Sequence, residues 1–284
     1  MRYLMPTDVQ EAAALLAEGS PKIIAGCTDF FPGQKQGSAS RDLLDVTRIS
    51  GLRGILERDE GWRIGAATTW SEIAGAVLPP AFEGLKQAAL EVGSLQIQNL
   101  GTIAGNICNA SPAADGVPPL LTLNASVELA SLRGPRRVPL SEFITGVRQI
   151  ALAEDEFVVA IHIPRPAQSA RGAFEKLGSR AHLVISIAMA ASVVELRNDV
   201  IVDAALAVGS CAPVARRLPE LEAFLVGKSV GELKELPLSN AEFFAPLSPI
   251  SDVRGSAEYR LDVVAELCRR VVMSAVSGGD HNGW

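Results

Sequence analysis

The sequence reads Gly101-Thr102-Ile103-Ala104-Gly105-Asn106-Ile107-Cys108-Asn109-Ala110-Ser111-Pro112-Ala113-Ala114-Asp115 near its middle, a run of small side chains that ends in one carboxylate. Asp115 is the only charged residue within 93–119. Glycine lets a backbone approach a ligand closely and direct amide groups at phosphate oxygens, while Thr and Ser hydroxyls add uncharged donors. So uncharged a loop is not typical of a solvent linker. The composition indicates contact with a dinucleotide.

A second segment of the same kind follows a short apolar strand predicted at 22–24. It reads Ala25-Gly26-Cys27-Thr28-Asp29-Phe30. Neither segment is a G-x-G-x-x-G fingerprint or a P-loop with its Lys, which disfavours the two commonest nucleotide-binding folds. Taken alone, each segment is more typical of a tight turn packed against a neighbouring element than of a ligand site.

The rest of the chain predicts a mixture of helices and strands. Thr7 and Gln10 form a capping-box pattern for a helix that should end at Gly19. Further strands are expected at 42–46, 62–66, 126–132 and 157–163, with helices at 71–76 and 80–92. Pro164-Arg165-Pro166 is the best candidate for a domain boundary. A hairpin, 185–196 and 200–210, and a helix capped by Ser256 should follow.

Composition excludes several classes of function. The net charge of −6 with scattered basic residues gives no electrostatic footprint for nucleic acid or an anionic membrane. The N-terminus lacks a signal-peptide pattern, which favours the cytoplasm, and no membrane-spanning segment is visible. Four separated cysteines and three histidines give no metal-ligand spacing, so the cysteines are expected to be reduced thiols. An organic cofactor should therefore carry any chemistry.

The wording and order of these pieces resembles the FAD-binding medium subunit of the xanthine dehydrogenase and carbon monoxide dehydrogenase family of molybdenum hydroxylases. That family has an A-G-G-T-D-like loop near the N-terminus and a G-T-I-G-G-N-I-x-x-A-S-P-A-A-D stretch near residue 100. Here they correspond to Ala25–Asp29 and Gly101–Asp115. The resemblance covers the whole chain, because residues 256–260, Ser-Ala-Glu-Tyr-Arg, match the start of the family's C-terminal helix.

The resemblance implies a set of FAD-binding residues. The first loop would place backbone amides on the FAD pyrophosphate, and the second motif would contact a phosphate and the ribityl chain. Asp115 would meet donors on the flavin side, Val158 would pack near the flavin, and Lys176 would lie near a basic contact. No catalytic side chain and no metal ligand is implied. The full set is Ile23, Ile24, Ala25, Gly26, Cys27, Thr28, Asp29, Phe30, Thr102, Gly105, Asn106, Asp115, Val158 and Lys176.

Two positions depart from the family pattern. Cys27 and Ala104 stand where many relatives have glycine. Both replacements are small, so close backbone approach stays feasible provided that neither position requires a positive φ.

The implied fold is α+β. Residues 1–168 would form a two-subdomain FAD-binding fold of the vanillyl-alcohol oxidase type, divided at about 1–55 and 56–168. Residues 169–284 would form a C-terminal domain of the CO dehydrogenase flavoprotein type. The cofactor would lie between the two N-terminal subdomains.

The implied activity is electron transfer. A large subunit would hold molybdopterin, a small subunit would hold two [2Fe-2S] clusters, and this chain would pass electrons from FAD to NAD⁺ or another acceptor. The assembly implied is a dimer of three-subunit units. Two alternatives stay open: a free-standing FAD oxidoreductase on the same fold, and a non-catalytic scaffold subunit that has lost its flavin.

Overall fold

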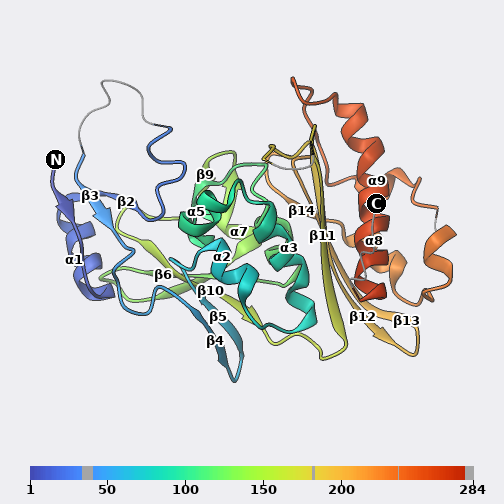
Figure 1. The fold of residues 1–284 in the computed structure, drawn as a ribbon, viewed down its shortest axis with the longest axis horizontal. Coiled ribbons are helices and arrows are strands. Elements are labelled where there is room, and N and C mark those ends of the chain that lie inside the picture. The colour runs from blue at the N-terminus through green and yellow to red at the C-terminus, as the bar shows by residue number, and fades with distance from the viewer. Residues whose placement is uncertain (34–40, 181–182, 236, 279–284) are drawn as a thin grey trace.

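The computed structural model describes residues 1–33, 41–180, 183–235 and 237–278. Three parts follow one another along the long axis of the molecule (Figure 1). The first is a small parallel sheet with one helix, the second a five-stranded sheet covered by short helices, and the third a four-stranded sheet with a long helix. The predicted α+β class is confirmed.

The first part holds α1 and a three-stranded parallel sheet in the order β1-β3-β2. The strands predicted near 22–24 and 42–46 are confirmed. The predicted helix cap is wrong by one residue: Asp8, not Thr7, accepts from the Glu11 amide, and the helix ends through Ser20 in a left-handed conformation. The elements are β1 (Tyr3–Leu4), α1 (Val9–Gly19), β2 (Lys22–Ile24) and β3 (Leu43–Asp45).

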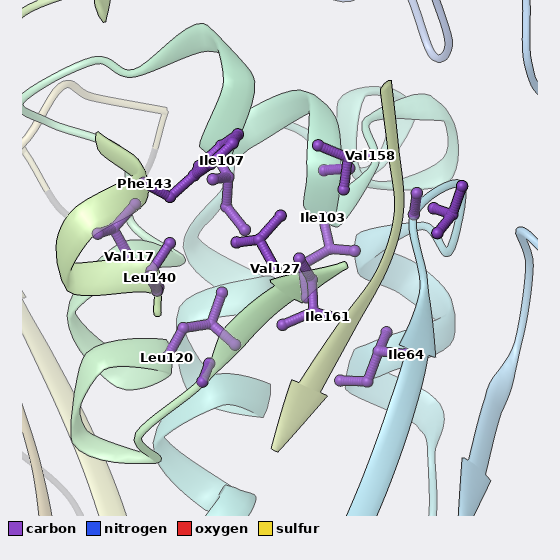
Figure 2. Packing of buried hydrophobic residues seen from close by; sticks show 14 of the residues in the cluster. Ile64, Ile103, Ile107, Val117, Leu120, Val127, Leu140, Phe143, Val158 and Ile161 are labelled. Carbon is purple, nitrogen blue, oxygen red and sulfur yellow. The ribbon is translucent and has the colours of Figure 1, made fainter. Parts of the chain in front are cut away.

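An antiparallel sheet in the order β4-β5-β10-β6-β7 forms the second part. Its central strand, β10, is apolar along nearly its whole length. This fits its position, because it pairs with a strand on each side and is almost wholly buried. Figure 2 shows Ile161 of this strand packed with Ile64 and Val127 from the neighbouring strands and with Ile103. The strands are β4 (Ile55–Arg58), β5 (Gly61–Gly65), β6 (Ser126–Ala130), β7 (Arg136–Pro139) and β10 (Phe157–Pro164).

Short helices cover this sheet. Phe82 and Leu85 are fully buried beneath them, and so is Trp70 at the start of α2. The elements are α2 (Trp70–Gly75), η1 (Pro80–Phe82), α3 (Glu83–Glu91), α4 (Leu95–Leu100), α5 (Ile103–Asn109), α6 (Val117–Thr122) and α7 (Leu140–Phe143), with a small hairpin of β8 (Ile144–Gly146) and β9 (Gln149–Ile150).

The stretch 93–119, expected to be a loop, is largely helical. Ser94 and Thr102 each cap a helix of six or seven residues with the side-chain oxygen. Gly116 stands before α6, which has Pro in its first turn. Helices this short span fewer than two turns, so they leave no apolar periodicity for sequence analysis to detect.

The third part is an antiparallel sheet in the order β11-β12-β13-β14. Successive residues of β12 enter different clusters: Ala188 and Ala190 pack with α9, whereas Met189 and Ala191 pack with Ala88 of α3. Both faces of the strand are therefore buried. The elements are β11 (Ala170–Leu177), β12 (Ala188–Arg197), β13 (Val200–Gly209), β14 (Arg216–Arg217), α8 (Pro219–Leu225), η2 (Glu232–Glu235), η3 (Ala241–Phe244) and α9 (Ala257–Ser277).

The predicted hairpin and final helix are confirmed, with Ser256 as the helix cap. The hairpin is shorter than expected, because its first strand begins at Ala188, whereas Ile185 and Ser186 line a cavity. The apolar residues at three-to-four-residue spacing along α9 are buried, namely Val264, Leu267, Val271 and Ala275, whereas Leu261 at its start is 40% exposed. No helix among the described residues is long and apolar enough to cross a membrane.

Candidate functional site

A cavity of about 450 Å³, here called the first cavity, lies between the loop after β2 and the start of α5. Residues 22–30 supply one wall, and α4, α5 and their connection supply another. Trp70 of α2 and Arg148 of the turn between β8 and β9 also line it. A volume of this order is typical of cofactor sites.

Gly26 fixes the loop against the rest of the cavity. The loop leaves β2 beside β3, where the Val46 amide donates to the Ile24 carbonyl over 3.1 Å. A Cβ added at Gly26 would lie 1.8 Å from the Leu100 carbonyl oxygen. The two backbones thus meet at van der Waals distance between α4 and α5, and only glycine fits there.

Cys27 has a left-handed backbone, with φ of 59°. The replacement of glycine by Cys27 was expected to be harmless only if this position did not require a positive φ. The structure shows a positive φ, so that expectation is not met. A non-glycine residue in this region carries strain of about 1–2 kcal/mol. Burial and the nearby Asp45 carboxylate raise the pKa of the Cys27 thiol, so it stays a neutral thiol at the cavity wall.

Thr102 and Asn106 present the second motif to the cavity. The Thr102 hydroxyl oxygen accepts from the Gly105 amide over 3.1 Å and caps α5. The Asn106 side-chain oxygen is buried and has no hydrogen-bond partner among the described residues. An unpaired buried acceptor is costly, and it fits a ligand that brings a hydroxyl or amide donor.

Basic side chains give the first cavity a positive bias. Arg148 donates to the Asn109 carbonyl over 3.0 Å, and the Asn109 amide nitrogen donates to Asp29 over 3.1 Å. The Lys22 ammonium lies 5.1 Å from the centre of the Phe30 ring. Two cations beside one carboxylate suit a ligand that carries phosphate charge.

The structure unites most of the predicted site. Ile23 to Phe30, Thr102, Gly105 and Asn106 all line the first cavity. The predicted set omitted Lys22, Trp70 and Arg148, which also line it, and it omitted Asn109 although this residue lies within the quoted second motif. Trp70 and Arg148 lie far from both motifs along the chain, and no local pattern marks them.

Three predicted residues lie outside this lining. Val158 is buried in β10 in the cluster that contains Ile103 (Figure 2). Asp115 and Lys176 form a buried ion pair of 2.9 Å, with side chains 11% and 6% exposed. The Ser186 hydroxyl donates to the other carboxylate oxygen of Asp115 over 2.8 Å.

A second cavity of about 310 Å³ lies beyond this ion pair. Ser111 to Ala113 from the second motif line it, together with Ile185, Ser186 and residues near the start of α9. Two polar atoms on its lining residues, Arg260 Nε and Ser210 Oγ, are buried without a hydrogen-bond partner in the described part of the chain. Its walls are otherwise mainly apolar.

Neither cavity carries a metal centre or a nucleophile with its base. The described residues contain no group of three His, Cys, Asp or Glu that could hold a metal ion. His182 and His281 lie outside them. Burial raises the pKa of Cys108 to about 12, which keeps this thiol protonated. The arrangement suits binding and orientation of an organic group.

Residues 1–166 match the family model of the FAD binding domain in molybdopterin dehydrogenase. The chain belongs to this family. Residues 173–275 match the model of the CO dehydrogenase flavoprotein C-terminal domain. The protein is thus an FAD-binding oxidoreductase component, and FAD is the predicted cofactor confirmed by this match.

Relatives cover nearly the whole chain. It is 31% identical over 280 residues to the xanthine dehydrogenase FAD-binding subunit of Escherichia coli O157:H7, covering 97% of this chain and 96% of that one. It is 30% identical over 279 residues to the nicotine 6-hydroxylase medium subunit of Paenarthrobacter nicotinovorans, covering 97% of each. The solved carbon monoxide dehydrogenase from Hydrogenophaga pseudoflava aligns with a TM-score of 0.88, 30% identity and 98% coverage of both chains.

The first cavity fits FAD on its own features. Glycine at position 26 keeps the loop backbone close, the unpaired Asn106 oxygen can accept from a ribityl or sugar hydroxyl, and Lys22 and Arg148 offset phosphate charge.

Proposed function

We propose that this chain is the electron-transfer subunit of a molybdenum hydroxylase complex, receiving electrons from a partner's iron–sulfur clusters and passing them through FAD to an acceptor. The observation that carries the proposal is the buried, unpaired Asn106 oxygen in the first cavity, which the two motifs and basic side chains surround. FAD supplies the ability to take electrons singly and release them in pairs.

The residues of the chain bind and orient that group. Backbone amides of the loop after β2, from Ile23 to Phe30, would hold the pyrophosphate, with Lys22 and Arg148 adding positive charge. Thr102, Gly105 and Asn106 would hold the second phosphate and the ribityl chain. Asp115, Lys176 and Val158 would lie toward the flavin. Lys176 donates to the carbonyl of Glu91, and the next residue, Val92, lines the first cavity.

The partners proposed are a small iron–sulfur subunit and a large molybdopterin subunit. The relatives named as medium subunits support this division, because that name implies larger and smaller companions. The four cysteines are free thiols without ligand spacing, so clusters would have to come from elsewhere. The proposal keeps the cytoplasmic location expected from the sequence and the division at residue 168.

The second cavity is the proposed entry for the electron acceptor. Arg260 Nε and Ser210 Oγ are buried without a partner on residues that line it, and its apolar wall suits a flat ring. NAD⁺ has a flat ring with a carbonyl group that would suit this lining, as do other flat acceptors. The hydroxylated substrate would bind on the large subunit.

The two alternatives predict different sites. The relatives that cover nearly the whole chain are named as subunits, which disfavours a free-standing flavoenzyme. A scaffold subunit without flavin would have no reason to retain a buried unpaired acceptor on a residue that lines a cavity.

The test is the activity of the purified chain alone. With FAD bound, it should oxidise NADH with an artificial dye at most and should hydroxylate no purine, aldehyde or N-heterocycle. Addition of the two partner subunits should be required for hydroxylation. Full hydroxylation by the isolated chain would refute the electron-transfer assignment and favour the free-standing enzyme.

A further inference from the structure

Asp115, Lys176 and Ser186 form a buried polar cluster from three separate segments. Lys176 lies on β11, Asp115 lies between α5 and α6, and Ser186 lies between β11 and β12. Lys176 donates to one carboxylate oxygen of Asp115 over 2.9 Å and to the Glu91 carbonyl over 3.2 Å. Ser186 donates to the other carboxylate oxygen over 2.8 Å. Both oxygens of Asp115 are therefore held by donors.

The cluster lies between the two cavities. On one side, Glu91 precedes Val92 in the wall of the first cavity. Gly116, next to Asp115, lies so close to Asn106 that an added Cβ would be 3.1 Å from its side-chain oxygen. On the other side, Ser186 itself lines the second cavity. Asp115 is 8% exposed and Ser186 is 2% exposed, so both are largely shielded from solvent, and Ser186 is the member of the cluster that lines the second cavity.

We propose that Asp115 takes up and releases a proton in step with the redox state of the bound FAD, and that Ser186 positions its carboxylate and connects it to the second cavity. The inference rests on the proposed function. Two electrons from the partner would leave one net negative charge in the first cavity, even after the flavin had taken up a proton of its own. One proton from solvent, entering by the second cavity, then binds an Asp115 oxygen. When the electron pair leaves to the acceptor, that proton returns to solvent.

The surroundings of Asp115 suit a group whose ionisation responds to nearby charge. Burial raises the pKa of the carboxyl, while the Lys176 ammonium and the Ser186 hydrogen bond lower it, and the Glu91 carboxylate raises it further. Burial and attraction thus oppose each other, and an additional negative charge close by raises the pKa again. The carboxyl would then be ionised beside oxidised FAD and protonated beside reduced FAD over an intermediate range of pH.

Ser186 sets the position of that range. Its hydroxyl donates to the charged form of Asp115, and loss of a hydrogen bond to a charged group raises a carboxyl pKa by about one to two units. Ser192 of the strand β12 offers a matched control. It is as buried as Ser186 and donates one hydrogen bond, to the Val271 carbonyl of α9.

The test measures the midpoint potential of FAD bound to the full chain against pH, in the unaltered protein and in Asp115→Asn, Ser186→Ala and Ser192→Ala variants. One extra proton per two electrons steepens the potential by about 30 mV per pH unit, because this corresponds to a tenfold change in proton activity. The unaltered chain should show this extra slope relative to Asp115→Asn. Ser186→Ala should move the pH range that shows the extra slope about one to two pH units higher, and Ser192→Ala should leave this range unchanged.

FAD content is measured first in every sample, so that failure of the proposed function is seen separately as absence of bound flavin. If Asp115→Asn retains no FAD, the shift in Ser186→Ala decides the matter. Identical potential curves for the unaltered chain and Ser186→Ala, or for the unaltered chain and a flavin-loaded Asp115→Asn, would overturn the inference.

Discussion

Cys27 illustrates how a single residue can be found from sequence while its conformation cannot. Its departure from glycine is visible by comparison with the family motif, and its place in the first cavity follows from the motif. Its φ of 59° depends on how the loop turns against α4 and α5, which the sequence does not specify. The strain at Cys27 is therefore a finding of the structure.

Cys27→Gly should stabilise the protein by about 0.5–1 kcal/mol. Release of left-handed strain contributes about 1–2 kcal/mol, and the greater freedom of glycine in the unfolded chain offsets about half of it. Urea unfolding followed by circular dichroism measures the difference. Ala25→Gly, two positions earlier in the same loop and without positive φ, should instead destabilise by a similar amount. Destabilisation by both substitutions would contradict the strain at Cys27.

Other residues of the site show the limits of sequence reasoning. The motifs identify the loop after β2 and the start of α5, because their residues are contiguous. Trp70 and Arg148 reach the first cavity only through tertiary packing, and Asp115 meets Lys176 across 61 positions of sequence. Such pairings leave no local signal, and for Lys176 only family resemblance indicated a role.

At the scale of elements, long patterned segments were predicted well and short ones poorly. The 21-residue helix α9 and the hairpin of β12 and β13 carry sustained periodicity and follow clear cap or turn residues. The helices α4, α5 and α6 do not, because each has only six or seven residues; α4 and α5 begin at side-chain caps, whereas α6 begins with Pro in its first turn and has no such cap. The capping role of Thr102 also explains why a motif of small residues is helical.

Glu156 joins two elements through charge. It lies before β10 and accepts from Arg136 over 2.6 and 2.7 Å and from Arg133, beside β7, over 3.2 Å. The Arg136 hydrogen bonds are the largest cause that lowers the pKa of Glu156 to about 2. A lowered carboxyl pKa stabilises the folded state above the unfolded value of about 4.5, and that stability is lost as pH falls toward 2.

Glu156→Gln should therefore destabilise the protein by about 2 kcal/mol at neutral pH and by much less at pH 3, since the unaltered carboxylate loses its advantage in acid. Chemical unfolding at a series of pH values from 3 to 7 measures both. Glu154→Gln, at an exposed neighbouring position, is the matched control. An equal loss of unfolding free energy at pH 3 and pH 7 would show that Glu156 contributes through its shape rather than its charge.

At the scale of the whole molecule, the chain places two cavities on either side of one buried ion pair. The first is built by the N-terminal sheet and the helices of the second part, and the second lies where the second part meets the C-terminal sheet. The three parts in Figure 1 therefore have to be joined for both cavities to exist. The second cavity arises only from the packing of these parts, and no local sequence pattern marks it.

The most direct test of the account is titration of the purified, flavin-free chain with FAD, followed by absorbance, in three forms. The unaltered chain should bind one FAD per chain. Gly26→Ala should bind at least tenfold more weakly, because its Cβ would collide with the Leu100 carbonyl. Gly75→Ala, where an added Cβ meets nothing within 4 Å, should bind normally. Absence of FAD binding by the folded, unaltered chain, or unchanged affinity in a folded Gly26→Ala variant, would contradict placement of the cofactor in the first cavity.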